Sequence, residues 1–283
     1  MVPPKTAILT DSTCDIPPSL LAKYHIEVIP QIIIWGDQTY RDRIDLSPTE
    51  FYQRLSADPV HPSTTQPSPV DFQDSYQKLF AAGAEQILVI TVSGEMSGTY
   101  QLACQVARDF PKPIRVIDSK GPTMSLGWQV LAAAQSRDRG EDLNQMIQKA
   151  KQVRENLQQY VYLDTLEYLH KGGRIGTASM WIGSVLQFKP LVRINHQTGI
   201  VEAAGRARTR KNGIALLWEE FFQSFPAQKP THIAVLHGNQ PDQAQALGKR
   251  IQEEYSPQEL IINITGPVLG VNTGPGALAL CGY

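Results

Sequence analysis

Short β-rich runs alternate with segments of helical periodicity along almost the whole chain. The predicted strands are 6–10, 26–35, 87–92, 114–118, 160–163, 191–195, 200–204, 232–237, 260–264 and 278–281. The predicted helices are 47–56, 69–82, 97–110, 124–135, 143–157, 177–188, 209–225 and 241–255. Because strands that alternate with helices are typical of βαβ units, the pattern predicts an α/β fold with largely parallel sheets.

The chain length and one turn divide this pattern into two halves. A chain of 283 residues is long enough for one large domain or two compact ones. The first half reads as successive βα units, which predicts an N-terminal domain with a largely parallel sheet and flanking helices. In the second half, "HQTG" (196–199) predicts a hairpin, and therefore a mixed sheet with helices. We place the boundary after the predicted helix 143–157, giving domains 1–158 and 159–283.

Charge and cysteine content exclude several classes of function. The 26 Lys and Arg residues nearly balance 27 Asp and Glu residues, which argues against a general nucleic-acid or membrane-surface binder. The three cysteines lack the spacing of a zinc site, so no metal is expected. No apolar run approaches the ~20 residues of a membrane helix. The first residues lack the pattern of a secretory signal, and we expect a cytoplasmic protein.

One predicted helix has a well-specified start. In "TTQPSPVDFQ" (64–73), Ser68 can cap the helix, Pro69 occupies its first position and Asp71 its third. This arrangement holds Thr64 and Thr65 in a fixed loop beside the helix start. An ordinary capped helix without any ligand explains the same residues equally well.

The stretch "ILVITVSGEMSGTYQLA" (87–103) places hydroxyls and a glycine between a predicted strand and a predicted helix. A helix N-terminus offers free N–H groups and partial positive charge, so it can hold a carboxylate or phosphate. Ser97 adds a hydroxyl donor, Gly98 permits close approach of the backbone, and Thr64 can reach in from the neighbouring loop. The alternative is that Ser97 only caps its own helix.

A catalytic interpretation of Ser97 is also open. A nucleophile elbow has the spacing G-x-S-x-G, whereas "GEMSG" (94–98) is one residue longer before the serine and one shorter after it. His237 is the candidate base, and Asp118 or Asp164 the candidate orienting acid of a serine esterase or lipid hydrolase. The mismatch in spacing favours binding over catalysis.

Two further clusters have less specific interpretations. Asp11 and Asp15 follow the first predicted strand, but two carboxylates without a nearby histidine fit turn and capping roles better than a metal site. Basic residues gather in "EYLHKGGRIG" (167–176) and "AGRARTRKNG" (204–213). A solvated surface explains them, and a docking surface for an acidic or phosphate-bearing partner is the functional alternative. The candidate docking residues are Arg174, Arg206, Arg208 and Arg210.

Taken together, eight motifs resemble the DegV family of bacterial fatty-acid-binding proteins. In family order they are "ILTDSTCDIP" (8–17), "STTQPSPVDF" (63–72), "SGEMSGTYQLA" (93–103), "VIDSKGPTMSLG" (116–127), "LEYLHKGGRI" (166–175), "KPLV" (189–192), "RARTRKNG" (206–213) and "GPVLGVNTGPGALA" (266–279). Each motif is modest alone, but eight in register over about 270 residues are highly specific. Thr65 stands where the family usually has serine.

The resemblance implies two α/β domains with a long-chain fatty acid between them and no other cofactor. It implies a non-enzymatic carrier that presents the fatty-acid carboxyl group to a separate ATP-dependent kinase subunit. We expect this carrier to be a monomer. The carboxyl contacts carry over to Thr64, Ser97 and the Gly98 backbone. The hydroxyls of Thr65 and Thr99 are secondary candidates.

One departure from the family falls in "GPVLGVNTGPG" (266–276), where Asn272 stands in place of a histidine found in many relatives. The glycine and proline content predicts a tight turn close to the head group. An asparagine amide can donate a hydrogen bond to a carboxylate, but it cannot move a proton. The alternative is that Asn272 bonds only its own backbone.

Overall fold

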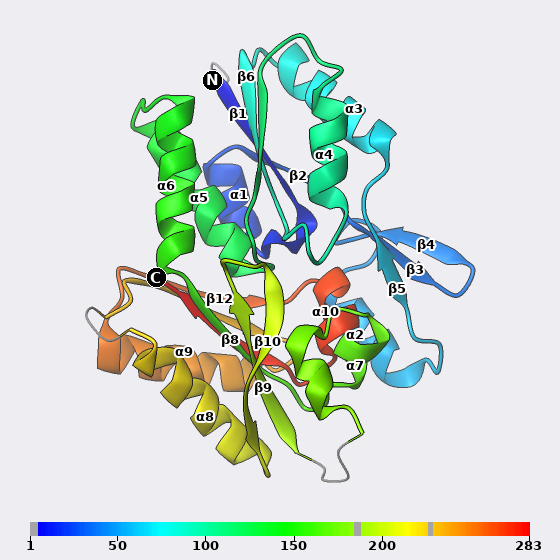
Figure 1. Ribbon diagram of the computed structural model, residues 1–283, viewed down its shortest axis with the longest axis vertical. Helices are drawn as coiled ribbons and strands as arrows, with labels where there is room; N and C mark the ends of the chain where they lie inside the picture. The colour runs from blue at the N-terminus through cyan, green and yellow to red at the C-terminus, as the bar shows by residue number, and fades with distance from the viewer. Residues whose placement is uncertain (1–4, 184–187, 226–228) are drawn as a thin grey trace.

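The computed structural model describes residues 5–183, 188–225 and 229–283, and it confirms an α/β fold (Figure 1). The N-terminal sheet is parallel, with strand order β2-β1-β6-β7. Its strands are β1 (Thr6–Asp11), β2 (Ile26–Ile29), β6 (Gln86–Thr91) and β7 (Ile114–Asp118). Its helices are α1 (Pro18–Lys23), α3 (Pro69–Ala81), α4 (Thr99–Ala107), α5 (Met124–Asp138) and α6 (Leu143–Asn156).

Apolar residues alternate between the two faces of this sheet, as the period of a strand requires. Ile8 and Leu88 pack on one face with Trp128 of α5. Leu9 and Val89 pack on the opposite face in the cluster that contains Phe72 and Tyr76 of α3 and Leu102 of α4. Both faces are therefore buried, which is the usual environment of a parallel sheet.

A second, antiparallel sheet of order β4-β3-β5 extends from the N-terminal half. Its elements are β3 (Ile32–Trp35), β4 (Gln38–Arg41) and β5 (Ser63–Thr65), with α2 (Pro48–Ala57) between β4 and β5. The prediction of one strand over 26–35 was wrong, because the chain leaves the parallel sheet at Pro30 and Gln31. Proline has no N–H to donate to a strand ladder, so Pro30 is a natural break.

The C-terminal sheet is mixed, with strand order β10-β9-β8-β13-β11-β12. Its strands are β8 (Gln158–Tyr162), β9 (Lys189–Asn195), β10 (Ile200–Ala207), β11 (His232–His237), β12 (Glu259–Ile264) and β13 (Leu278–Gly282). Only the β11–β12 pair among these is parallel. The predicted hairpin is confirmed, and Gly199 supplies its residue of positive φ, at 84°.

Helices cover one face of this sheet and leave the other to the N-terminal half. The outer face packs in one apolar cluster with α8 (Arg210–Gln223) and α9 (Pro241–Tyr255). The inner face belongs to the cluster that also contains Trp128 and Ile8. Along the chain, β8 is the first strand to enter this sheet. The division of the chain into two domains at residue 158 stays a prediction. Across the described ranges, no helix has the length and apolarity to cross a membrane.

The helix predicted over 177–188 was wrong. The structure has a 3-10 helix, η2 (Gly176–Trp181), and Phe188 lies directly before β9, while 184–187 fall outside the described residues. Gly176 and Gly183 both have positive φ, a conformation that interrupts an α-helix.

Two short helices near the inner face were not predicted. They are α7 (Glu167–Lys171) and α10 (Pro267–Thr273). The tight turn expected over 266–276 is wrong for most of its length, because 267–273 are helical. Pro267 fits there because the first helical position needs no N–H donor.

Candidate functional site

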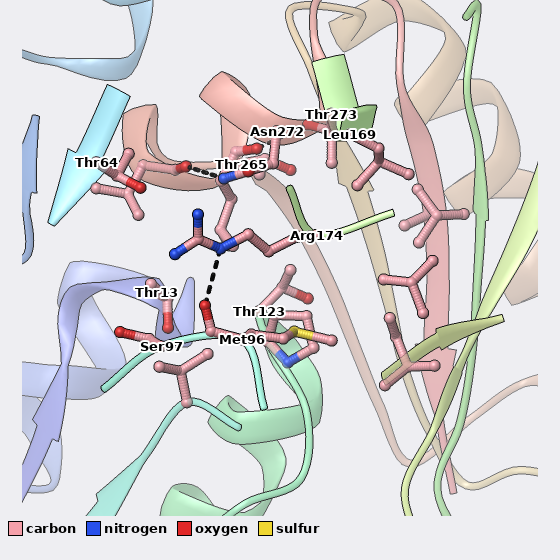
Figure 2. Close-up of a pocket in the computed structure, with 18 of the residues that line it drawn as sticks. Thr13, Thr64, Met96, Ser97, Thr123, Leu169, Arg174, Thr265, Asn272 and Thr273 are labelled. Atoms are coloured by element: carbon pink, nitrogen blue, oxygen red, sulfur yellow. Dashed lines mark hydrogen bonds between the residues drawn. The ribbon is translucent and has the colours of Figure 1, made fainter. Parts of the chain in front are cut away.

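A cavity lies between the N-terminal loops and the inner face of the C-terminal sheet (Figure 2). Its volume of about 190 Å³ exceeds the ~150 Å³ that holds a benzene-sized molecule, so it suits an organic ligand. Its polar lining comprises Thr13, Gln31, Thr64, Thr65, Gln66, Ser97, Thr123, Gln159, Arg174, Thr265, Asn272 and Thr273. Its apolar lining includes Val92, Met96, Val161, Leu163, Leu169, Val192, Ile194, Val201, Leu236, Val268, Ala277 and Ala279.

The N-terminal wall is built where strands of the parallel sheet end. Thr13 follows β1, Ser97 follows β6 and Pro122 follows β7, and all three line the cavity. Loops after the carboxyl ends of parallel strands meet at one edge, which is where α/β proteins bind ligands. Thr64 enters from β5, which pairs with β3. The structure therefore brings Thr64 and Ser97 to one cavity.

Ser97 precedes helix α4 rather than beginning it. The helix starts at Thr99 with Gly98 as its N-cap, so the predicted start at 97 was two residues early. Ser97 Oγ lies 2.7 Å from Thr99 Oγ1 and accepts from the Thr99 N–H at 3.3 Å. Thr99 in turn accepts a hydrogen bond of 2.9 Å from Gln31 Nε2. Ser97 thus supports its own helix start and also faces the cavity.

Gly98 lies in close contact with the end of a neighbouring side chain. A Cβ atom at Gly98 would collide with the side-chain oxygen of Gln66. The cavity is lined by three consecutive residues, Thr64, Thr65 and Gln66. Helix α3 follows this segment, and Ser68 and Asp71 form the predicted capping box at its start. The close contact holds the β5 segment against the start of α4.

Asn272 lies in the last turn of α10 and lines the cavity. Its Nδ2 donates to the Val268 carbonyl at 3.0 Å, so one amide proton bonds its own helix. Its Oδ1 is buried and, among the described residues, has no hydrogen-bond partner. A Cβ atom at Gly172 would collide with this oxygen, which places the amide against the loop that follows α7. The second amide proton is free for a ligand.

Arg174 extends into the cavity, although the sequence analysis placed it on a docking surface (Figure 2). Its Nε donates to the Met96 carbonyl at 2.9 Å, and its Nη1 donates to the Gly172 carbonyl at 2.6 Å. These bonds tie the C-terminal half to the loop that carries Ser97. They also hold a cationic group beside the hydroxyls, at the solvent-exposed mouth of the cavity.

The other three arginines lie away from the cavity lining. The Arg206 guanidinium lies over Trp181 and Phe188, at 5.6 and 5.4 Å from the ring centres, and Arg208 is exposed. Arg210 is half-buried in an ion pair with Asp164 at 2.8 Å. Because its charge is neutralised internally, we leave Arg210 out of the docking surface.

A buried ionic cluster holds α10 against the N-terminal half. Asp15 accepts from the Gly266 N–H at 3.0 Å and forms an ion pair with Arg43, which donates to the Ile264 carbonyl. Asp42 accepts from Ser12 at 2.6 Å, and burial raises its pKa to about 7. These contacts fix the chain on both sides of the start of α10, and thereby the position of Asn272.

Asp11 has the capping role that the sequence favoured. It caps the 3-10 helix Ser12–Cys14 and accepts from the Val92 N–H at 2.7 Å. Burial raises the pKa of its carboxyl, while the hydrogen bond from Thr13 opposes that shift. The described residues contain no group of three or more His, Cys, Asp or Glu side chains suited to a metal ion.

Comparison with known proteins assigns the chain to a family. The model of the family described as "Uncharacterised protein, DegV family" matches residues 5–283. A DegV domain-containing protein of Streptomyces coelicolor is 34% identical over 276 residues, covering 97% of this chain and 96% of its own. The chain belongs to the DegV family.

Two solved DegV structures have nearly the same fold. A fatty-acid-binding DegV family protein from Thermus thermophilus has a TM-score of 0.90 and 30% identity, with 99% of both chains covered. DegV from Bacillus subtilis, described as a fatty acid binding protein, has a TM-score of 0.89 and 26% identity, with 98% of both chains covered. The predicted resemblance to the family is confirmed.

In this DegV-family chain, the candidate base His237 and the candidate acid Asp164 are hydrogen-bonded to other residues. His237 Nδ1 accepts from the Gln240 N–H at 3.1 Å, and Asp164 bonds Tyr162 and Arg210. Among the described residues, no hydrogen bond joins Ser97 to a histidine. A nucleophilic serine needs such a base to activate its hydroxyl. The geometry therefore supports a binding role for Ser97.

Sequence reasoning missed several polar residues of the DegV cavity. They are Thr13, Gln31, Gln66, Thr123, Gln159, Thr265 and Thr273. Thr13 and Thr123 lie in motifs that had been singled out for the family resemblance, and their position after β1 and β7 is the signal that could have found them. Gln159 lies inside a strand and had no such signal.

Proposed function

We propose that this protein binds a long-chain fatty acid in the cavity between its two halves. The carboxyl group lies at Thr64, Ser97 and the Gly98 backbone, with Asn272 donating from α10. Thr65 lines the same cavity and is a secondary hydroxyl. Thr99, the other secondary candidate, is buried behind Ser97, to which it is hydrogen-bonded. The observation that carries the proposal is a cavity with hydroxyls and Arg174 at one end and apolar walls beyond them.

The apolar walls match an acyl chain in chemistry and direction. On β8, Leu163 and Val161 face the cavity, and Val161 pairs with Ala279 on β13 and Val192 on β9. At about 0.8 kcal/mol per buried CH₂, a sixteen-carbon chain contributes on the order of 11 kcal/mol of gross burial. This term exceeds the contribution of any single polar contact, so the walls supply most of the affinity.

The head-group end can hold the carboxyl group in its charged form. A desolvated carboxylate without partners is prohibitively costly. Here it would meet neutral hydroxyl and amide donors together with the Arg174 guanidinium, whose remaining nitrogen is not used by the Met96 and Gly172 carbonyls. Charge-assisted hydrogen bonds of this kind are roughly twice as strong as neutral ones.

We further propose that the bound carboxyl group is presented to a separate ATP-dependent kinase subunit, which forms the acyl phosphate. The family resemblance supports this step, together with the exposed position of Arg174 at the cavity mouth. In this proposal the protein itself acts as a carrier, and the chemistry takes place on the partner. The family resemblance supports this role, as do the hydrogen bonds of Ser97, which among the described residues involve no histidine.

The decisive experiment is mass spectrometry of solvent extracts from the purified protein. We expect a fatty acid of about fourteen to eighteen carbon atoms in a stoichiometric amount, because burial of such a chain makes its release slow. Titration of delipidated protein with a fluorescent fatty acid measures the affinity independently. Protein that stays free of lipid, fails to bind the probe and hydrolyses an ester substrate would overturn the proposal.

A further inference from the structure

The end of the cavity opposite the head group is polar, although the walls before it are apolar. Gln159, Val161 and Leu163 alternate along β8 and its extension, and all three line the cavity. Leu163 and Ala277 lie towards the head group, since Ala277 follows α10 closely in sequence. Gln159 lies at the other end of the row and is only 1% exposed. A buried amide in an apolar cavity requires hydrogen-bond partners.

The spacing along β8 places this amide far along an acyl chain. Leu163 lies four positions after Gln159 in the chain, which corresponds to roughly 13 Å of strand. With carbon–carbon bonds of about 1.5 Å at near-tetrahedral angles, this distance spans about ten carbon atoms. Gln159 is therefore positioned beside the distal half of a long-chain ligand.

Thr123 lines the same end of the cavity from the N-terminal half. Its Oγ1 accepts from the Met124 N–H and lies 3.5 Å from Gln159 Nε2. Its backbone has φ 53° and ψ −136°, a conformation that β-branched residues rarely adopt. Such strain persists only where the surroundings impose it, and it is common at ligand sites. The hydroxyl proton of Thr123 remains free to donate.

The hydrogen bonds around Ser125 and Thr123 show which way the Gln159 amide faces. Ser125 Oγ contacts both Gln159 and His196 Nε2, the latter at 2.7 Å. Ser125 Oγ donates to Gln159 Oε1, so the amide oxygen faces Ser125 and away from Thr123. The Gln159 NH₂ group therefore points towards Thr123 and the cavity, with Nε2 at 3.5 Å from Thr123 Oγ1. One of its two amide protons remains free to donate.

We propose that this end of the cavity binds a hydroxyl group on the distal part of the acyl chain, so that long-chain hydroxy fatty acids are a preferred ligand class. The ligand hydroxyl accepts from the Gln159 NH₂ group and forms a second hydrogen bond with the Thr123 hydroxyl. This inference rests on the proposed fatty-acid binding. It adds a specificity determinant to the apolar walls, which by themselves accept plain and hydroxylated chains with only modest discrimination.

The test compares stearic acid with isomers hydroxylated at about the sixth or the twelfth carbon, the positions expected beside Val161 and Gln159. Affinities come from competition with a fluorescent fatty acid on delipidated protein. We expect the sixth-carbon isomer to bind roughly tenfold or more weakly than stearic acid, because its hydroxyl lies against apolar walls. We expect the twelfth-carbon isomer to bind at least as tightly as stearic acid.

Two variants connect this preference to the polar end. Gln159→Leu should weaken binding of the distal isomer roughly three- to tenfold relative to its effect on the binding of stearic acid. Val161→Ala is the matched control on the same strand, and it should weaken both ligands equally. If Gln159→Leu fails to fold, the isomer series on the wild-type protein decides alone.

The outcomes separate this inference from the function on which it rests. Tight binding of stearic acid with a penalty for both hydroxylated isomers would overturn the hydroxyl site and leave fatty-acid binding intact. An unchanged isomer preference in a folded Gln159→Leu variant would also overturn it. Failure to bind any of the three acids would overturn both.

Discussion

Single residues at the head-group end give the most direct test of the carboxyl contacts. We expect Ser97→Ala to weaken fatty-acid binding by about 1–3 kcal/mol, because it removes one partner of a buried charged group. Thr64→Ala should behave similarly, since Thr64 faces the same cavity. Fluorescence competition measures both changes. Unchanged affinity in the double variant would show that the carboxyl group lies elsewhere.

Substitutions at Asn272 test whether its side-chain amide binds the ligand or only its own helix. Asn272→Asp should bind far more weakly than Asn272→Ala, because it sets a second carboxylate beside that of the ligand and raises the pKa of one of them. Asn272→His should bind with a pH dependence near the usual histidine pKa of about 6.5. Affinity is measured from pH 5 to 8. Equal affinities of the Asp and Ala variants would place residue 272 outside the head-group site.

The raised pKa of the buried Asp42 carboxyl predicts that the stability of the protein depends on pH. Burial raises this pKa from 3.8 to about 7, so in this range the folded protein binds a proton that the unfolded chain has lost. The contribution to stability is therefore fully present below about pH 4 and is lost as the pH rises through 7. Asp42→Asn should remove this contribution from the free energy of unfolding, as measured by urea denaturation.

Comparing the wild-type protein with Asp42→Asn also separates the contribution of Asp42 to the unfolding free energy from that of His196. Burial lowers the pKa of His196 from 6.5 to about 4, so its contribution has the opposite sign and stability is lost as the pH falls through this window. That contribution is common to both proteins and cancels in their difference. A difference in unfolding free energy that stays constant from pH 4 to pH 8 would contradict the assignment to Asp42.

The four residues predicted to bind the carboxyl group line one cavity, and their motifs indicated this from sequence. Thr64, Ser97 and Gly98 lie at ends of elements, where turn and capping residues can be recognised. Arg174 was placed on the outer surface instead, because a charged residue between glycines carries no sign of the direction in which it points. Gln159 could not be found, since its function depends on which face of β8 meets the cavity.

At the scale of elements, long periodic segments were predictable and short ones were not. Helices such as α6 and α9 match their predicted ranges closely, because an amphipathic pattern over several turns is unambiguous. The α7 and α10 helices are too short for such a pattern. They pack on each other, and α10 also packs on α2. The break between β2 and β3 depends on two different sheets, which a single apolar run cannot distinguish.

The capping box of α3 gives a prediction at this scale. Ser68 and Asp71 bond each other's backbone N–H groups, and Ser68→Ala removes one of these bonds. We expect a loss of about 1 kcal/mol in the free energy of unfolding. Ser75→Ala, in the middle of the same helix, is the matched control and should change stability little. Equal effects of the two changes would show that the cap contributes nothing.

At the scale of the whole molecule, the exposed arginines outside the cavity test the proposed kinase partner. Arg206→Glu together with Arg208→Glu should slow acyl-phosphate formation with the cognate kinase subunit, while fatty-acid binding stays unchanged. The effect should be largest at low salt, where charges on a surface are least screened. Arg250→Glu, on α9, is the matched control for surface charge. Normal turnover by the double variant at low salt would contradict the docking surface.

The position of β13 affects how this molecule is made. β13 is the last strand along the chain, yet it lies in the middle of the C-terminal sheet, between β8 and β11. While the chain is being synthesised, β8 to β10 and β11 to β12 therefore exist as separate groups until residues 278–282 leave the ribosome. Ala279 of the cavity wall comes from this strand, so the N-terminal half can fold early, but the acyl chain can be enclosed only after β13 has been made.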